Sequence, residues 1–365
     1  MRKGWEYKSF ETCINKLPKA KQVKTSEYSS GTKYPIISQE DKLISGYYDD
    51  ESYVFHIDSP VVIFGDHTRV LKYIDFDFVV GADGVKIISP QKDLNAKFLL
   101  YYLQWYKIPN LGYSRHYKLL REIKIPLPPQ STQLAIVSEL DKINELIRLK
   151  KEQLKDFDNL AQSLFYEMFG DPVENEKGWE VKKLGEIAKS AIGLTYKPEN
   201  VTEELSGTVV LRSSNIQNSI LDFNDIVRVN VLVKEDKMVN DGDILMCSRN
   251  GSFRLVGKVA LIKGLKERMS YGAFMTIIRS PYNPYLFEYF KTPAFRQYLI
   301  TGKTTTVNQI TVKMLNNLTL PLPPLSLQQL FAQRIEQIER EKSEVQKSIQ
   351  DLETLLASRI QYWFE

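Results

Sequence analysis

Hydrophobic residues recur at strict heptad spacing in two long stretches of the chain. The first stripe, in steps of four and three, is Ile136, Leu140, Ile143, Ile147, Lys150, Leu154, Phe157, Ala161, Leu164 and Met168. The second stripe is Phe331, Ile335, Ile338, Lys342, Val345, Ile349, Leu352, Leu356, Arg359 and Trp363. A narrow stripe sustained over about five heptads is typical of a coiled coil rather than of a helix lying on a globular domain.

The two stretches repeat one another without a gap. Ile125–Gln133 reads IPLPPQSTQ, and Leu320–Gln328 reads LPLPPLSLQ, 195 residues later. A second repeated motif, KGWE, occupies residues 3–6 and 177–180, an offset of 174 residues. The second half therefore carries 21 more residues of loop. An internal duplication fixes the architecture, so each half is expected to be a globular segment followed by a long helix.

The expected fold class is α+β. Two similar mixed α/β domains, 1–122 and 176–319, would be separated by two spacer helices, 123–175 and 320–365, packed as an antiparallel coiled coil with pseudo-two-fold symmetry. Each helix of about 37 residues would be about 55 Å long. Two independent surface helices are the alternative.

Local patterns predict the elements of the globular segments. Strands are expected at 53–56, 61–64, 85–88, 208–211, 244–247, 256–262 and 274–278, and helices at 96–106 and 284–299. Ser131 and Ser326 are predicted N-caps of the long helices, and Gly170 is a predicted C-terminal stop.

Charge is distributed unevenly along the chain. Lys and Arg outnumber Asp and Glu by 18 to 15 in residues 1–122 and by 20 to 14 in 176–319. The helical segments are net negative, with 6 against 9 in 123–175 and 5 against 7 in 320–365. Basic domains joined by acidic helices favour a polyanionic ligand for the domains alone. The two cysteines, the lack of an apolar signal core and the absence of a 20-residue apolar run favour a cytoplasmic protein without a membrane span.

No motif in the sequence indicates catalysis, a cofactor or a metal site. The three histidines lack neighbours at metal-ligand spacing, and no phosphate-binding glycine loop is present. Asn283-Pro284-Tyr285 is interpreted as a loop before a helix. Asp66, Asp75, Asp77 and Asp83 are interpreted as loop and strand-edge residues rather than a nuclease site.

Polar loops at matching places in the two halves are the candidate DNA contacts. Their side chains are the types that hold phosphates and read base edges. In the first half the candidates are Ser38, Gln39, His67, Arg69, Ser114, Arg115, His116 and Lys118. In the second half they are Arg212, Asn215, Arg249, Asn250, Arg254, Lys303, Thr305, Asn308 and Gln309. Equivalent loops with different sequences suggest one scaffold that reads two targets.

These features together resemble the specificity subunit of type I restriction-modification enzymes. The resemblance rests on the two Leu-Pro-Pro segments at Leu127 and Leu322 with the helices that follow, on Trp5 and Trp179, and on the tail LFYEMFGDP at 164–172. It implies two target-recognition domains that each read half of a split site in double-stranded DNA. It also implies that the helices set the gap and dock two modification (methyltransferase) subunits.

The same resemblance implies that this chain is not itself an enzyme. S-adenosylmethionine, ATP and Mg²⁺ would be bound by partner subunits, including a restriction (nuclease-translocase) subunit. A modification-only complex without a nuclease, a stand-alone DNA-modifying enzyme, and a coiled-coil adaptor that binds only protein remain as alternatives.

Overall fold

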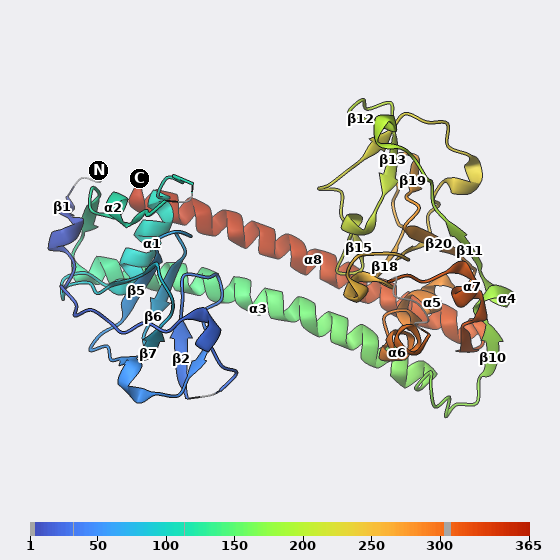
Figure 1. Cartoon of the computed structure of the whole chain (residues 1–365), viewed down its shortest axis with the longest axis horizontal. Helices are drawn as coiled ribbons and strands as arrows, with labels where there is room; N and C mark the ends of the chain where they lie inside the picture. The colour runs from blue at the N-terminus through green and yellow to red at the C-terminus, as the bar shows by residue number, and fades with distance from the viewer. Residues whose placement is uncertain (1–3, 32, 113, 303–307) are drawn as a thin grey trace. The chain divides into compact units, whose positions relative to one another are not determined.

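The chain folds into two compact units, one built from two separate stretches of sequence and the other from one continuous stretch (Figure 1). The computed structural model describes residues 4–31, 33–112, 114–302 and 308–365. Unit 1 comprises Met1–Glu152 and Val345–Glu365, and unit 2 comprises Gln153–Glu344. Each unit therefore combines one globular segment with half of each long helix, because the boundaries fall within α3 (Gln130–Phe169) and α8 (Leu325–Phe364).

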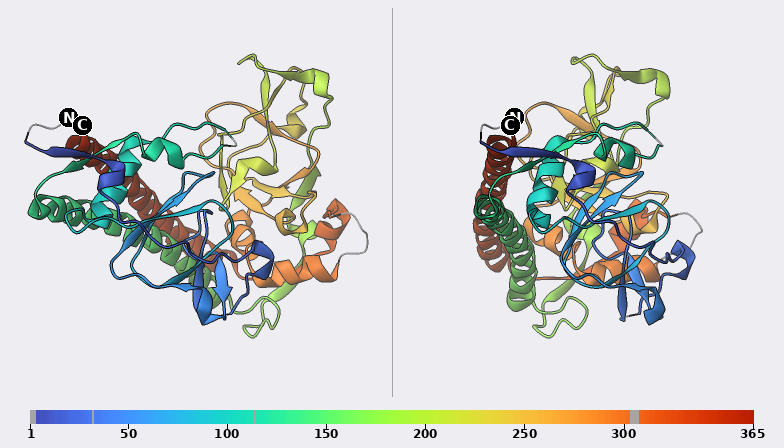
Figure 2. Two further views of the ribbon diagram at one scale, coloured as in Figure 1. Left: turned by 60° about the vertical axis from the view of Figure 1, so that its left-hand side comes forward. Right: turned by 90° about the vertical axis from the view of Figure 1, so that its left-hand side faces the viewer.

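Unit 1 contains nine strands and two shorter helices in its described part. The strands are β1 (Glu6–Ser9), β2 (Tyr34–Ile37), β3 (Gly46–Tyr48), β4 (Val54–Phe55), β5 (Val61–Gly65), β6 (Leu71–Ile74), β7 (Phe78–Val80), β8 (Val85–Ile88) and β9 (Lys124–Leu127). The helices are α1 (Ala96–Tyr106) and α2 (Tyr117–Leu120). Within this unit α1 lies between the strands and the helix pair (Figure 2), where Tyr101 Oη donates to Asp141 Oδ1 of α3 at 2.7 Å.

Unit 2 repeats this plan with longer loops. Its strands are β10 (Glu180–Lys183), β11 (Lys189–Ile192), β12 (Val201–Thr202), β13 (Thr208–Leu211), β14 (Ile216–Gln217), β15 (Ile220–Leu221), β16 (Arg228–Val229), β17 (Ile244–Cys247), β18 (Val259–Leu261), β19 (Met269–Tyr271), β20 (Met275–Arg279) and β21 (Thr319–Leu322). Its shorter helices are α4 (Leu184–Ile187), α5 (Asn283–Tyr289), α6 (Pro293–Thr301) and α7 (Val312–Asn317).

Strand pairing shows that the two units share one topology. In unit 1 the order β6-β5-β8 forms one sheet, and in unit 2 the order β18-β17-β20 recurs within a four-stranded sheet. The second sheet of each unit contains one parallel pair, β2 with β7 and β13 with β19. The antiparallel neighbours β3 and β16 also correspond.

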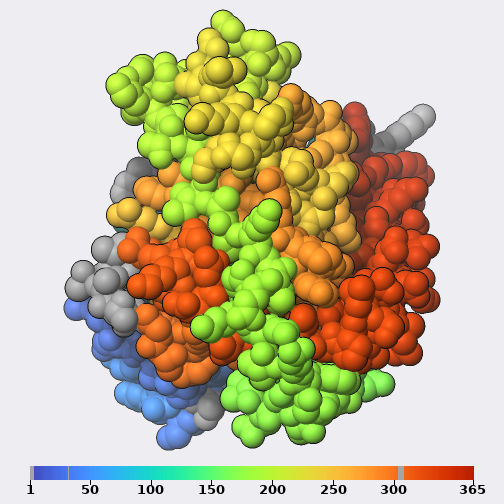
Figure 3. Space-filling model, turned by 90° about the vertical axis from the view of Figure 1, so that its right-hand side faces the viewer, coloured from blue at the N-terminus to red at the C-terminus, as the bar shows by residue number. Residues whose placement is uncertain are grey.

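The repeated motifs of the sequence pair with one another in a two-stranded ribbon. Glu6 of β1 faces Leu127 of β9, and Glu180 of β10 faces Leu322 of β21. Glu6 and Glu180 are 174 residues apart, whereas Leu127 and Leu322 are 195 residues apart. The two repeated motifs, with their different offsets, therefore pair in the same hydrogen-bonded register in both units. Proline is tolerated in β9 and β21 because each lies at a sheet edge. Figure 3 shows green β10 against orange and red residues from the last third of the chain.

The long helices run antiparallel to one another within each unit. In unit 1 Lys151 Nζ lies 2.8 Å from Glu353 Oε1, and Arg359 pairs with Glu139. In unit 2 Lys342 Nζ lies 2.8 Å from Asp158 Oδ1. The predicted heptad stripe is confirmed as the covered face, with these residues buried or half-buried: Ile136, Leu140, Ile143, Ile147, Leu154, Phe157, Leu164, Phe331, Ile335, Ile338, Val345, Ile349, Leu352 and Leu356.

Two polar members of the stripe, Lys342 and Arg359, each pair with a carboxylate of the facing helix. Burial alone would lower the pKa of Lys342, but hydrogen bonds from its ammonium to Asp158 and Glu339 outweigh burial and raise that pKa. Arg359 donates to Glu139, and this bond lowers the pKa of the carboxyl group, with a further hydrogen bond from Trp363 Nε1 at 3.0 Å. These pairs fix the register of the seam.

Each repeat contributes its final phenylalanine to the core of the other repeat's unit. Phe364, the last residue of α8, packs in unit 1 with ring centroids 5.4 Å from Phe98 and 5.6 Å from Tyr102. Phe169, the last residue of α3, packs in unit 2 at 5.0 Å from Tyr285 and 4.9 Å from Phe331. Neither core is complete without a segment from the other half of the sequence.

The starts of the long helices correct one prediction. Ser131 and Ser326 are not N-caps, since α3 already begins at Gln130 and α8 at Leu325. Pro129 and Pro324, which precede the two helices, have a fixed φ that suits the entry into a helix. Each helix therefore begins one residue before the predicted serine. A buried glutamine secures each start instead: Gln133 Nε2 donates to Pro128 O at 2.9 Å, and Gln328 Nε2 donates to Pro323 O at 2.7 Å.

The predicted end of the first long helix at Gly170 is confirmed, whereas the prediction of one helix over 284–299 is wrong. Gly170 follows α3 with φ +79°, and its N–H donates to Tyr166 O at 2.8 Å. The single helix expected at 284–299 is two helices, α5 and α6. Pro293 cannot continue a helix, and Thr292 caps the new one by accepting from Phe295 N–H.

Replacing Phe331 with alanine is expected to destabilise unit 2. Phe331 is fully buried against Phe165 and Phe169, so its loss should lower the free energy of unfolding by about 3–5 kcal/mol. The neighbouring Leu330 is 43% exposed, and Leu330→Ala should change stability by less than about 0.5 kcal/mol. Urea denaturation followed by circular dichroism checks both, and equal losses would contradict the packing described.

Candidate nucleic-acid interface

Three polar loops of unit 1 converge at one end of its sheets. Gln39, which follows β2, accepts the N–H of His67 at its Oε1 (3.2 Å) and the hydroxyl of Thr68 at its backbone oxygen (2.6 Å). His67 and Thr68 belong to the turn between β5 and β6. Asp66 of that turn accepts from the N–H groups of His116 (2.8 Å, backbone oxygen) and Tyr117 (2.8 Å, Oδ1) at the start of α2.

The equivalent loops of unit 2 converge in the same way. Asn250, in the turn between β17 and β18, donates from Nδ2 to Ser213 Oγ at 3.2 Å, after β13. The same residue donates its backbone N–H to Asn308 O at 3.3 Å. Asn308 Nδ2 in turn donates to Gly251 O at 2.9 Å. Segments that the sequence presents separately thus form one surface in each unit, because the strands before them end together.

Several predicted contacts shape the loops from inside. His116 is fully buried; its Nδ1 donates to Asp66 O (2.9 Å) and its Nε2 accepts from Leu111 N–H (3.0 Å). Asn215 is buried and spans its own loop, with Nδ2 donating to the backbone oxygens of Asp222 and Asp225 at 2.9 Å. Ser38 is buried, 2.6 Å from Ser45 Oγ. These side chains position their neighbours and offer little to a ligand.

Other predicted contacts present charge to solvent. Arg115, Lys118, Arg249 and Arg254 are exposed, whereas Ser114 and Gln309 are half-buried. Two predicted arginines are engaged within the protein, since Arg212 pairs with Asp225 at 2.7 Å and Arg69 Nη1 donates to Ile108 O at 3.1 Å. Lys303 and Thr305 lie outside the described residues.

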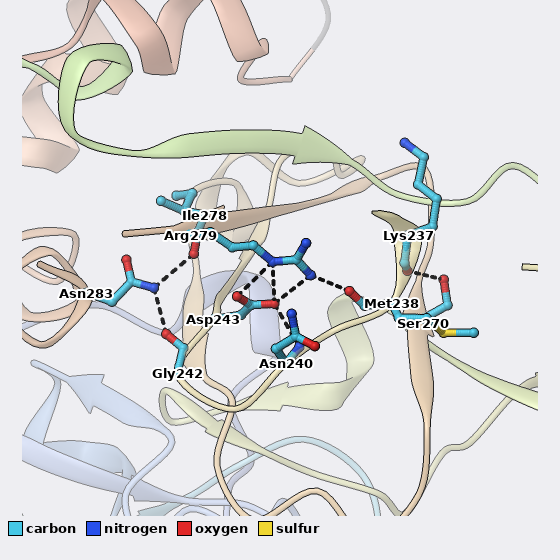
Figure 4. A network of polar contacts seen from close by, with 9 residues as sticks. All are labelled: Lys237, Met238, Asn240, Gly242, Asp243, Ser270, Ile278, Arg279 and Asn283. Carbon is cyan, nitrogen blue, oxygen red and sulfur yellow. Dashed lines mark hydrogen bonds and ion pairs between the residues drawn. The ribbon is translucent and has the colours of Figure 1, made fainter. Parts of the chain in front are cut away.

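An ion pair between buried Asp243 and half-buried Arg279 anchors the base of the β17–β18 hairpin in unit 2 (Figure 4). Asp243, before β17, is buried and accepts from Arg279 Nε of β20 at 3.0 Å with both carboxylate oxygens. Asn283 Nδ2 donates to Gly242 O (2.6 Å) and to Ile278 O (3.0 Å), which ties the same turn to α5. Hydrogen bonds to Asp243 raise the pKa of the Arg279 guanidinium. The network fixes the strand that leads into Ser248–Arg254.

An open cavity of about 520 Å³ adjoins the loop cluster of unit 1. Leu71, Leu103 and Ile108 give it an apolar floor, and Arg69, Lys107 and other polar residues line its rim. Its position beside the β5–β6 turn places further cationic side chains next to the converging loops.

The described residues offer no grouping of His, Cys, Asp or Glu suited to a metal ion. Asp66 is a loop anchor as above. Asp77 accepts from Ile57 N–H at 2.9 Å and lies 2.6 Å from His56 Nδ1; the first bond and then the second lower the pKa of this carboxyl group. Asn283-Pro284-Tyr285 forms the first turn of α5 and is not a loop before a helix, which corrects the interpretation from sequence. Among the described residues, no helix combines the length and hydrophobicity needed to cross a membrane.

Sequence reasoning missed one exposed aromatic residue within the loop cluster. Phe274 was expected to begin a buried strand, but β20 starts one residue later and the side chain of Phe274 is 57% exposed. The guanidinium Cζ of Arg249 lies 5.1 Å from its ring centroid. A phenylalanine that precedes the apolar run at 275–278 looks like a core residue, so the sequence held no signal for its exposure.

Comparison with known proteins identifies relatives of both halves. The family model described as type I restriction modification DNA specificity domain matches residues 3–156 and 176–354. The type I restriction enzyme EcoKI specificity subunit of Escherichia coli K12 is 27% identical over 167 residues, which are 44% of this chain and 36% of that protein. The chain thus matches about a third of the length of this curated relative.

Solved structures share the fold at low sequence identity. A chain from a structural study of complex assembly and conformational transition of the type I R-M system gives a TM-score of 0.60 at 19% identity, covering 100% of this chain and 98% of that one. The type I restriction-modification S subunit from M. genitalium gives 0.57 at 14% identity, covering 99% and 96%.

His116→Ala is expected to loosen the loop cluster of unit 1. Because both ring nitrogens bridge Asp66 and Leu111, their loss leaves buried groups unsatisfied and should lower the free energy of unfolding by about 2 kcal/mol. Hydrogen–deuterium exchange should show faster exchange of the Leu111 amide. Arg115→Ala, at the exposed neighbouring position, is the control and should leave stability and exchange unchanged. Equal exchange in both variants would show that His116 does not hold the loop.

Proposed function

Because this chain belongs to the type I restriction-modification DNA specificity family, we propose that it is a specificity subunit that reads a two-part DNA sequence. Each unit would recognise one half-sequence through its cluster of converging loops. The observation that carries this proposal is the shared topology of the two units combined with different polar side chains at equivalent places. A repeated scaffold with unlike reading surfaces suits a target with two unlike halves.

The chemistry of the loops supports double-stranded DNA as the ligand. The globular segments are net positive and the helical segments are net negative, so phosphates are attracted to the domains. Exposed arginines can donate two hydrogen bonds to guanine O6 and N7, and amide side chains can do the same to adenine. The exposed guanidinium groups of Arg115 and Arg249 are suited to this role.

The long helices are proposed to set the gap and to dock partners. Two modification (methyltransferase) subunits would supply S-adenosylmethionine and the catalytic groups, and a restriction (nuclease-translocase) subunit with ATP and Mg²⁺ would complete the complex in the cytoplasm. In this proposal the chain itself positions DNA and performs no chemistry. A methylated but uncleaved genome would instead identify a modification-only complex. Methylation by the purified chain alone would identify a stand-alone enzyme.

Arg115→Ala and Arg249→Ala are expected to weaken recognition of opposite half-sequences. If each guanidinium contacts a base, its loss should cost about 1–3 kcal/mol for duplexes that carry the matching half and should relax one position. Fluorescence anisotropy of the complex with modification subunits, on duplexes altered in one half at a time, measures this.

The control for these two variants is Arg268→Ala, which removes a cation of unit 2 that pairs with Glu235. A uniform affinity loss over all duplexes would identify Arg115 and Arg249 as phosphate contacts rather than base contacts.

Inserting one heptad into both long helices is expected to lengthen the gap and leave both half-sequences unchanged. Suitable facing positions lie beside Lys151 and Glu353, whose charged groups are 2.8 Å apart. Seven residues add about 10 Å of helix, or about three base pairs. Methylome sequencing of a strain that carries the variant and its modification subunit reads the new motif.

The matched control inserts the heptad into α3 alone. Unequal helices cannot keep the seam in register, so this variant should lose stability rather than acquire a new gap. Altered half-sequences after the double insertion would contradict a spacer role for the helices.

A further inference from the structure

Phe274 is fixed to the recognition loop of unit 2 through its backbone. Its carbonyl oxygen accepts the N–H groups of Ser248 (2.9 Å) and Arg249 (3.1 Å) and the hydroxyl of Ser248 (3.0 Å). The backbone of Phe274, from which the ring projects, is therefore fixed relative to the turn between β17 and β18. Single exposed apolar side chains are common on protein surfaces, so exposure alone assigns no role to Phe274.

Arg249 lies on this ring and has no carboxylate partner among the described residues. Its Cζ is 5.1 Å from the ring centroid, within the range of a cation–π contact. Other arginines of unit 2 pair with acids, such as Arg212 with Asp225 at 2.7 Å and Arg228 with Glu267 at 2.7 Å. The ring thus orients the Arg249 guanidinium while its charge and donors stay available for a ligand.

Unit 1 has a glycine at the equivalent position, in a backbone conformation that residues with side chains rarely adopt. Gly84 O accepts Asp66 N–H at 2.7 Å, as Phe274 O accepts Ser248 N–H, and both residues directly precede the paired strands β8 and β20. Gly84 has φ +95°, and a Cβ there would lie 2.7 Å from Gln39 Oε1. An aromatic ring at this point of the scaffold is therefore particular to unit 2, as expected of a residue that distinguishes the two half-sequences.

We propose that Phe274 is a specificity-determining residue that contacts the 5-methyl group of a thymine next to the base pair read by Arg249. The methyl group of thymine is the apolar feature that a base pair exposes in the major groove, and phenylalanine is among the side chains that contact it. One face of the Phe274 ring packs against the Arg249 guanidinium and would orient it toward a neighbouring guanine. The opposite face would contact the methyl group of the thymine. This inference rests on the proposed function.

The test removes the methyl group from the DNA. The complex of this chain with its modification subunits is assayed by fluorescence anisotropy on its methylome-defined duplex, with each thymine of the Arg249-dependent half replaced in turn by deoxyuridine. One replacement should weaken binding about three- to fivefold, as expected for one buried methyl group. Phe274→Ala should bind the thymine and deoxyuridine duplexes equally.

Phe274→Tyr is the conservative variant and should restore the preference for thymine, because it keeps the ring beside Arg249. Leu232→Ala is the matched control; Leu232 is 98% exposed in unit 2, and its removal should leave the thymine preference intact. The deoxyuridine series on the unchanged complex keeps the proposal testable even if Phe274→Ala reduces stability.

Two results would overturn this role for Phe274. One is a half-sequence in which no deoxyuridine replacement weakens binding; the other is a thymine preference that survives Phe274→Ala. Both leave the two-part motif itself standing. A complex that methylates without any two-part motif would instead refute the proposed function.

Discussion

Each unit depends on the antiparallel pairing of α3 and α8, because this pairing brings half of the other repeat's helix into its core. Phe364 reaches the aromatic residues of α1 in unit 1, and Phe169 reaches Tyr285 in unit 2. The buried faces of both helices are apolar, while Lys342 and Arg359 find carboxylates on the facing helix. Apolar burial supplies the stability of the seam, and the charged pairs restrict it to one register.

The same scaffold supports two unlike loop surfaces because its anchors are internal. Hydrogen bonds to buried backbone groups place the loops, as with His116 in unit 1 and Asn215 in unit 2. Once anchors fix the backbone, the exposed side chains can differ without disturbing the fold. Gly84 and Phe274 illustrate this. Their carbonyl oxygens accept the N–H groups of equivalent loop residues, Asp66 and Ser248, but only Phe274 carries a side chain.

Regular periodicity made much of this fold predictable from sequence. The heptad stripes predicted the covered faces of α3 and α8, and the repeated motifs predicted two halves built on one plan, whose motifs the structure pairs in a ribbon. The helix at 96–106 and the strands at 85–88, 208–211 and 244–247 have the bounds that their patterns indicate. These elements are specified locally by their own side chains.

Features set by distant partners could not be predicted in this way. The first turn of α3 is secured by Gln133 rather than by a serine, and this side chain also bonds to Asn95 N–H and Asp93 O, which reach it only in the folded protein. His116 looks like a ligand-binding residue in sequence and is an internal bridge in structure. Phe274 looks like a core residue and is exposed, since burial depends on which strands surround it.

The division of the chain also determines the order in which it can fold during synthesis. Unit 1 needs Val345–Glu365, which are translated after all of unit 2, whereas unit 2 is a continuous stretch that ends at Glu344. Domains usually complete their folding from the N-terminus onward as translation proceeds. Here the internal unit can close first, and the N-terminal globular segment must wait with an incomplete core until Phe364 has been translated.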